Sequence, residues 1–266
     1  MKFLCVLLLS VPVLLHGQGM VDGFTRGKGN TDLALTLSAE LSKKYYAGTD
    51  KVSLGRNKTI GSIFAARGIT DWMDISANIP YIKLNDETDF QDGALYIKVK
   101  PWSRKISENT WSFLASAGLR APLSNYQTEG GSAIGQQDTT IDVRGLAQLH
   151  LSSGVFIAIQ SGYTFKSSPV PSTFPAAIKV GKTADGYYVD GWVDFQYTDK
   201  GKDYRGEGDK KSNSFRELGV SYLKIGGVYY KTINETFGWT LGGDYVLLGR
   251  NTDKSLRVSV GLVLKL

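Results

Sequence analysis

The C-terminal stretch SLRVSVGLVLKL, residues 255–266, alternates apolar and polar side chains with a period of two. Such a period places successive side chains on opposite faces of an extended strand. One face of this stretch is therefore apolar, and the other carries Arg257 and small or polar residues. The same alternation recurs in residues 33–41, 111–119, 141–151 and 237–247. No stretch beyond residue 20 shows a useful length of helical periodicity, so the sequence predicts an all-β protein.

We predict twelve strands, at about 30–41, 57–67, 72–83, 93–102, 110–121, 139–151, 155–166, 174–183, 187–198, 214–232, 236–248 and 255–266. Most of them are roughly twice as long as the ~5–6 residues of an ordinary globular strand. They are close to the ~9–11 residues that a tilted strand needs to cross a bilayer. This length favours a single antiparallel transmembrane β-barrel over a soluble sandwich.

The connections between these strands alternate in length. The long, mostly polar ones are 42–56, 84–92, 122–138, 167–173, 199–213 and 249–254. Transmembrane barrels place long loops outside the cell and short turns on the periplasmic side. An even number of strands puts both chain ends on the short-turn side. We expect GGSAIG, residues 130–135 in the third long loop, to be flexible.

The N-terminus has the features of a cleaved signal peptide. A basic start at Lys2 precedes an apolar run over 3–15, and small residues follow at Gly17 and Gly19. The run is too short for a transmembrane helix, which needs about 20 apolar residues. We therefore expect 1–19 to be removed, with cleavage between 17 and 20, and 20–266 to form the barrel in a Gram-negative outer membrane.

Composition agrees with this class and excludes others. Glycine accounts for 31 of 266 residues, well above the usual share of about 7%. The mean hydropathy of -0.15 argues against a helical membrane protein. One cysteine and two histidines allow neither an internal disulfide nor a zinc cluster, so we expect no metal and no cofactor. Nothing resembles a nucleic-acid-binding module.

Aromatic residues near the predicted strand ends indicate which face meets lipid. They are Trp72, Tyr81, Trp102, Trp111, Tyr163, Tyr187, Tyr197, Phe237 and Tyr245. Membrane barrels carry such aromatic girdles at both interfaces, with an apolar outer face and a polar interior. The expected partners are outer-membrane lipids and lipopolysaccharide.

Several segments resemble an outer-membrane β-barrel family associated with the MetA pathway of phenol degradation. They are RGITDWMDISANIPYI (67–82), DGALYIKVKPW (92–102), SFLASAGLRAPLSNY (112–126), FPAAIKVGKTADGYYVDGWVDFQYTD (174–199) and SVGLVLKL (259–266). The resemblance implies an outer-membrane location and uptake of small, often hydrophobic molecules. It supplies no catalytic residues. Leu266 departs from the aromatic residue that ends many such barrels.

The polar faces of the strands supply candidates for the lumen and for a transport path. They are Asp74, Lys98, Lys100, Arg120, Asp142, Arg144, His150, Lys179, Tyr188, Asp190, Trp192, Asp194, Asp244 and Arg257. Six are basic and five acidic, a near balance that suggests a salt-bridged, partly filled interior. Twelve strands permit a narrow channel but no wide porin. These charges either stabilise the barrel or form a solute path, and Tyr188 and Trp192 either fill volume or stack on a solute.

Two further functions stay open beside a passive channel for small, including hydrophobic or aromatic, molecules. The first is a non-transporting barrel whose long loops serve adhesion, envelope structure or binding. The second is lipid hydrolysis, because His150 and Ser152 are two residues apart and share a strand face, as a base and a nucleophile would. The inward direction of His150 disfavours an enzyme. The solute and the oligomeric state do not follow from the sequence.

Overall fold

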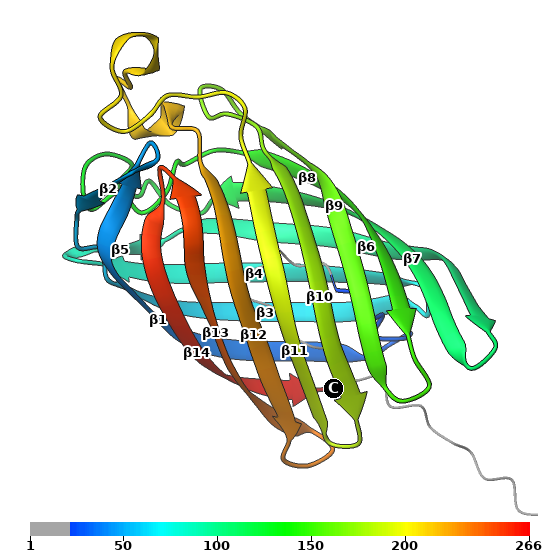
Figure 1. Cartoon of the computed structure of the whole chain (residues 1–266). Helices are drawn as coiled ribbons and strands as arrows, with labels where there is room; N and C mark the ends of the chain where they lie inside the picture. The colour runs from blue at the N-terminus through cyan, green and yellow to red at the C-terminus, as the bar shows by residue number, and fades with distance from the viewer. Residues whose placement is uncertain (1–21) are drawn as a thin grey trace, which may run out of the picture.

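The structure is a computed structural model that describes residues 22–266 (Figure 1). The predicted signal peptide lies outside the described residues. Twelve long strands form the wall of the barrel: β1 (Thr31–Ala47), β3 (Lys58–Thr70), β4 (Met73–Leu84), β6 (Asp92–Ile106), β7 (Asn109–Pro122), β8 (Thr140–His150), β9 (Val155–Lys166), β10 (Phe174–Ala184), β11 (Tyr187–Tyr197), β12 (Ser221–Thr232), β13 (Phe237–Arg250) and β14 (Asp253–Lys265). Each pairs antiparallel with its neighbours along the chain. The predicted fold class is confirmed.

Pairing of the last strand with the first closes the barrel. β14 lies antiparallel to β1 from Asp32 opposite Lys265 to Tyr45 opposite Asp253. At the chain ends, Thr31 and Leu266 exchange backbone hydrogen bonds of 2.8 Å. Closure leaves no unpaired edge to template aggregation. Both ends of the described chain therefore lie at the end of the barrel that has the short turns, as predicted.

Short strands and 3₁₀ turns lie at the opposite end of the barrel, which has the long loops (Figure 1). β2 (Asp50–Ser53) pairs with the end of β1, and β5 (Glu87–Phe90) pairs with the end of β4. The connection from β11 to β12 contains two 3₁₀ turns, η1 (Gly208–Lys210) and η2 (Phe215–Glu217). Among residues 22–266, no helix is long and apolar enough to cross a membrane.

Burial alternates along the strands as the sequence predicts, with the apolar face outward. In β1, Leu35 and Leu37 are 59% and 56% exposed, whereas Ala34 and Ser38 are each 3% exposed. Large exposed apolar side chains cover the outside of the wall all the way round. Aromatic contacts lie near both rims, including Trp102–Phe113 and Tyr163–Phe165, with ring centroids 5.2 and 4.7 Å apart. The outer surface is thus apolar with aromatic rims, the pattern of a bilayer-spanning barrel.

Three predicted boundaries are wrong at the long-loop end. The first strand, predicted to end at 41, continues to Ala47. The strand predicted over 214–232 begins only at Ser221, because Ser214 caps the turn η2 by accepting a hydrogen bond from the Arg216 backbone N–H at 3.2 Å. The long loop predicted over 249–254 is a two-residue turn between β13 and β14. Its first residue, Asn251, has a φ of 52°, which asparagine tolerates better than most residues.

Large aromatic side chains on the inner face lie over glycines of neighbouring strands. A Cβ on each glycine would come within 2.2–2.5 Å of a ring atom of its partner. The pairs are Tyr96 over Gly118, Phe156 over Gly181, Trp192 over Gly226 and Tyr230 over Gly238. Part of the high glycine content therefore makes room for rings that narrow the lumen.

Candidate channel lumen

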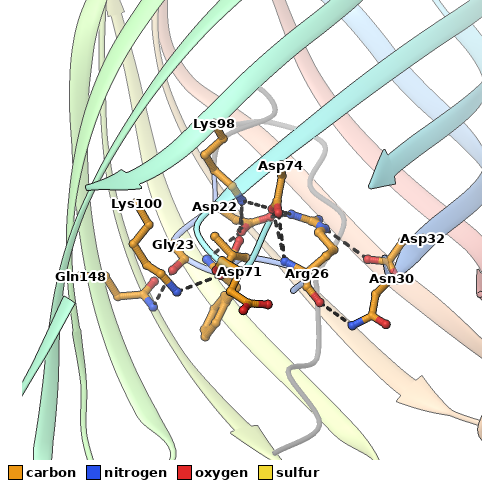
Figure 2. Close-up of polar contacts among 12 residues, drawn as sticks. Asp22, Gly23, Arg26, Asn30, Asp32, Asp71, Asp74, Lys98, Lys100 and Gln148 are labelled. Carbon is orange, nitrogen blue, oxygen red and sulfur yellow. Dashed lines mark hydrogen bonds and ion pairs between the residues drawn. The ribbon is translucent and has the colours of Figure 1, made fainter. Parts of the chain in front are cut away.

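The segment 22–30, which precedes β1, lies at the short-turn end of the barrel, with residues 22–27 inside it and residues 28–30 exposed (Figure 2). Asp22, Gly23, Thr25 and Arg26 of this plug segment are buried. From the sequence, these residues are expected only to begin the barrel, and no plug is predicted. The signal that could have found it is the pair of opposite charges, Asp22 and Arg26, in a polar stretch that precedes the first strand.

Ion pairs fix the plug segment to the wall. The Arg26 guanidinium lies 3.1 Å from Asp22 Oδ2, 3.2 Å from Asp32 Oδ2 and 3.3 Å from Asp74 Oδ2. From β6, the Lys98 ammonium lies 2.9 Å from Asp22 and 3.3 Å from Asp74. It also donates to the Phe24 carbonyl oxygen. Figure 2 shows these groups converging from the plug segment, β1, β4 and β6. Three carboxylates thus share two buried cations.

Two hydrogen bonds and a close backbone approach also hold the plug segment against the wall. Gln148 Nε2 donates to the Gly23 carbonyl at 3.2 Å, and Lys100 Nζ donates to Thr25 Oγ1 at 2.8 Å. A Cβ on Gly68 of β3 would lie 1.9 Å from the Gly27 carbonyl oxygen. Only a residue without a side chain permits this approach, so Gly68 is part of the docking surface of the plug.

The pKa values of the two charged side chains Asp22 and Arg26 of the plug segment are shifted. Burial alone would raise the pKa of the Asp22 carboxyl, but Arg26 and Lys98 outweigh it and lower that pKa to about 2. Burial opposes the charge of Arg26, yet Asp22, Asp32 and Asp74 raise its pKa. Both groups are therefore ionised at neutral pH, and their attraction holds the segment in place.

Aromatic packing completes the closure of the short-turn end. Phe24 of the plug meets Phe156 edge-on at 5.2 Å between centroids, and Phe156 stacks on Tyr188 at 5.4 Å. Tyr188 is fully buried and donates to Asp190 Oδ2 at 2.7 Å. The Lys179 ammonium lies 2.9 Å from the same oxygen. These groups are packed and paired, which favours the volume-filling interpretation of Tyr188.

A cavity of about 410 Å³ lies in the lumen. β3 and β4 contribute apolar side chains to its lining, among them Ile60, Phe64 and Ile82. β7 and β8 contribute Arg120, Asp142 and Arg144. The cavity therefore has an apolar side and a strongly polar side, and its volume is within the usual range of small-molecule pockets.

Most charges around the cavity are paired. The Glu40 carboxylate forms ion pairs with Lys58 Nζ at 2.9 Å and with Arg257 Nη2 at 3.1 Å. Arg144 pairs with Asp142 of its own strand at 2.7 Å. Glu40 and Lys58 are not among the lumen residues predicted from the sequence, although the alternation of β1 already places Glu40 on the polar face. The lining is thus a network of compensated charges, as the near balance in the sequence suggested.

The loop over 123–139 narrows the opposite mouth of the lumen. Ile134 is buried and packs with Ile82 and Leu84 of β4. The Arg56 guanidinium donates to the carbonyl oxygens of Gly131 and Ala133 at 2.5 and 2.6 Å. The stretch 130–135, expected to be a flexible loop, is therefore anchored in the mouth. Ile134 lines both the main cavity and a second one of about 160 Å³ toward the loops.

The predicted lumen residues are buried or half-buried, but they separate into three groups. At the plug segment lie Asp74, Lys98 and Lys100. The main cavity is lined by Arg120, Asp142, Arg144 and Arg257. The remaining candidates, which belong to the packed wall outside that lining, are His150, Lys179, Tyr188, Asp190, Trp192, Asp194 and Asp244. Their role in transport stays a prediction.

The structure does not join His150 and Ser152 into a hydrolytic pair. The His150 ring nitrogen Nε2 lies 3.1 Å from Thr183 Oγ1. The ring faces Phe24 of the plug at 6.1 Å between centroids. Ser152 is exposed in the turn after β8. His150 is therefore packed and hydrogen-bonded at the short-turn end of the lumen.

Outer-membrane channels are among the solved structures similar to this chain. The COG4313 outer-membrane channel from Pseudomonas putida F1 is similar with a TM-score of 0.70 and 13% identity, over 90% of this chain and 96% of that one. The NanC porin is similar with a TM-score of 0.55 and 11% identity, over 88% and 100% of the two chains. The KdgM porin has a TM-score of 0.52 and 7% identity, over 87% and 98%.

No known family profile matches the sequence, and no curated protein matches it. At these low identities the likenesses establish the fold. The chain has the barrel fold of outer-membrane channels and porins, with a narrow, plugged lumen.

Proposed function

We propose that this protein is a passive outer-membrane channel for small molecules, closed at rest by its plug segment. The observation that carries the proposal is the polar cavity of about 410 Å³ between the loop 123–139 and the plug segment. A barrel built only as an anchor would gain stability from a filled interior, because cavities forfeit packing contacts. The similarity to outer-membrane channels and porins supports the same function.

The proposal includes the placement of the chain. Residues 1–19 direct export and are removed, and the apolar outer face then contacts outer-membrane lipids. The long loops face outward, where their charged residues meet lipopolysaccharide, and the short turns and plug face the periplasm. Solutes enter the cavity past Ile134 and leave toward the periplasm when the plug segment is displaced. Hydrophobic or aromatic molecules are the proposed solutes, because Ile60, Phe64 and Ile82 give the lining an apolar part.

The test is ion and solute flux through the refolded full-length protein. Heat-modifiable gel mobility first establishes that the barrel is folded. Single-channel currents in planar bilayers and swelling of proteoliposomes in small sugars then report flux. We expect small conductance from the wild type and a larger, steadier conductance from a chain that lacks residues 22–29.

Two outcomes separate the alternatives. A folded barrel that passes neither ions nor solutes, with or without residues 22–29, would refute the passive channel. In that case the loops become the functional part of the molecule, in adhesion or partner binding. Flux through the shortened chain alone would keep the channel and show that the plug segment must be displaced in the cell.

A further inference from the structure

One positive charge on the cavity lining forms neither an ion pair nor a hydrogen bond within residues 22–266. Of the charged residues that line the cavity, six are paired or hydrogen-bonded: Glu40, Lys58, Asp92, Asp142, Arg144 and Arg257. The seventh, Arg120, makes no ion pair with any residue in the described part of the chain. Its Nε is buried without a hydrogen-bond partner. A buried donor left unsatisfied costs stability, so this guanidinium is available to an incoming acceptor.

The register of the strands places an amide beside this arginine. Asn78 of β4 lies opposite Ala94 of β6, and Ala94 lies opposite Arg120 of β7. Two inter-strand spacings of ~4.8 Å put the backbones of Asn78 and Arg120 about 10 Å apart. The small side chain of Ala94 leaves the space between them open. The Asn78 side chain, too, has no hydrogen bond within residues 22–266, and all three residues line the cavity.

An apolar ring continues the same row. Phe64 of β3 lies opposite Asn78 and also lines the cavity. From β3 to β7 the row therefore presents a ring, an amide, a gap and a guanidinium. A guanidinium binds a carboxylate with two parallel hydrogen bonds, an amide N–H₂ adds a further donor, and an aromatic face packs against another ring.

We propose that this row is a binding site for small organic anions with a planar apolar body, of the aromatic carboxylate class. The carboxylate lies over Ala94 and accepts hydrogen bonds from Arg120 and Asn78, and the apolar body lies against Phe64. The proposal rests on the channel function and specifies its solute. Of the three acidic residues of the lining, Glu40 and Asp142 form ion pairs, and Asp92 accepts a hydrogen bond from the Tyr126 hydroxyl. The acidic side chains therefore offer cations little net attraction.

The test is equilibrium dialysis of the full-length protein in neutral detergent against three probes of nearly equal shape: benzoate, benzamide and benzamidine. They carry negative, zero and positive charge. We expect saturable benzoate binding, with benzamide roughly tenfold weaker or more because a charge-assisted hydrogen bond is lost. Saturable binding of benzamidine as tight as benzoate would overturn the proposal.

Variants locate the site. Arg120→Gln should weaken benzoate binding roughly tenfold or more and leave benzamide binding nearly unchanged. The matched control Arg104→Gln removes the same charge from an exposed position near the short-turn end of β6 and should change neither. Ala94→Leu, which fills the gap without changing charge, should abolish binding of both probes. Its control is Ala77→Leu, on the opposite face of the wall in β4.

The results also separate this inference from the channel function. Suppose that the wild type binds benzoate, that Arg120→Gln does not, and that the folded barrel carries no current. This result would support the binding site and refute the channel function. Ion flux without saturable benzoate binding, or benzoate binding that survives Arg120→Gln, would overturn the site.

Discussion

The two ends of the lumen are closed by different kinds of contact. At the short-turn end, a plug segment is held by ion pairs among side chains that are 2–6% exposed, and by stacked rings. At the loop end, the stretch 130–135 is held by hydrogen bonds from one arginine, Arg56, to two backbone carbonyls, and by the contacts of Ile134. The first closure is held by ion pairs between the plug segment and the wall. The second is held by hydrogen bonds to neutral carbonyls, including one from Gln91 to Ile134 at 3.3 Å, and by apolar contacts.

This difference teaches where control of the channel resides. Breaking a buried ion pair by removing one partner costs about 3–5 kcal/mol, because the remaining charge is left without compensation. Loss of hydrogen bonds to neutral carbonyls costs less, about 1.5–3 kcal/mol each even with a charged donor. The short-turn end should therefore be the stronger barrier.

Arg26→Met should have the largest effect. It removes the guanidinium from Asp22, Asp32 and Asp74, which leaves Asp22 and Asp74 with Lys98 alone and Asp32 without its ion pair. The plug segment should lose several kcal/mol of docking free energy, and the single-channel conductance should rise several-fold. Arg67→Met, at an exposed residue near the same end, is the control. Unchanged conductance in a folded Arg26→Met barrel would contradict the role of charge in the closure.

Gly68→Ala should open the same end by sterics alone. The new Cβ would meet the Gly27 carbonyl oxygen at 1.9 Å, whereas a Cβ on Gly61 of the same strand meets nothing within 4 Å. Overpacking of this kind typically costs about 1–3 kcal/mol, so we expect a smaller rise in conductance than for Arg26→Met. Gly61→Ala should behave as wild type. Equal behaviour of the two variants would show that the plug does not depend on this contact.

Glu40→Gln should alter selectivity rather than closure. Lys58 loses one of its two acidic partners and Arg257 loses its nearer one, so the lining gains positive charge. The anion-to-cation permeability ratio, measured from the zero-current potential in a salt gradient, should rise a few-fold. The control Glu87→Gln lies exposed in β5. A shift toward cations would mean that Glu40 does not face the ion path.

Mild acid should have the smallest effect. The pKa of Asp22 falls from 3.8 to about 2 when the plug is docked. A lowered pKa means that the contribution of Asp22 to docking is complete above pH ~4 and is lost only as the pH falls toward 2. Conductance measured at pH 7 and pH 5 should therefore agree. Opening of the short-turn end at pH 5 would show that another group controls the plug.

The sequence by itself determined the wall of the barrel. Period-two alternation in 33–41 and 255–266 defined which side chains point outward, and the strand lengths and alternating loops indicated the barrel and the end at which the termini meet. These features are local, because the direction of a strand side chain depends only on its position in the strand. The same parity placed Arg120 and Arg144 on the inner face.

Only the tertiary structure decided how the interior is used. The plug segment has no periodic pattern, and its burial depends on Asp74 and Lys98, far away in the chain. Strand register, which a two-residue repeat leaves open, brings Asn78, Ala94 and Arg120 into one row. Pairing likewise assigns Lys179 and Asp190 to the packed wall and leaves Arg120 without an ion pair in the described part of the chain. These outcomes depend on long-range contacts, because the free energy of a buried charge is set by the groups that surround it.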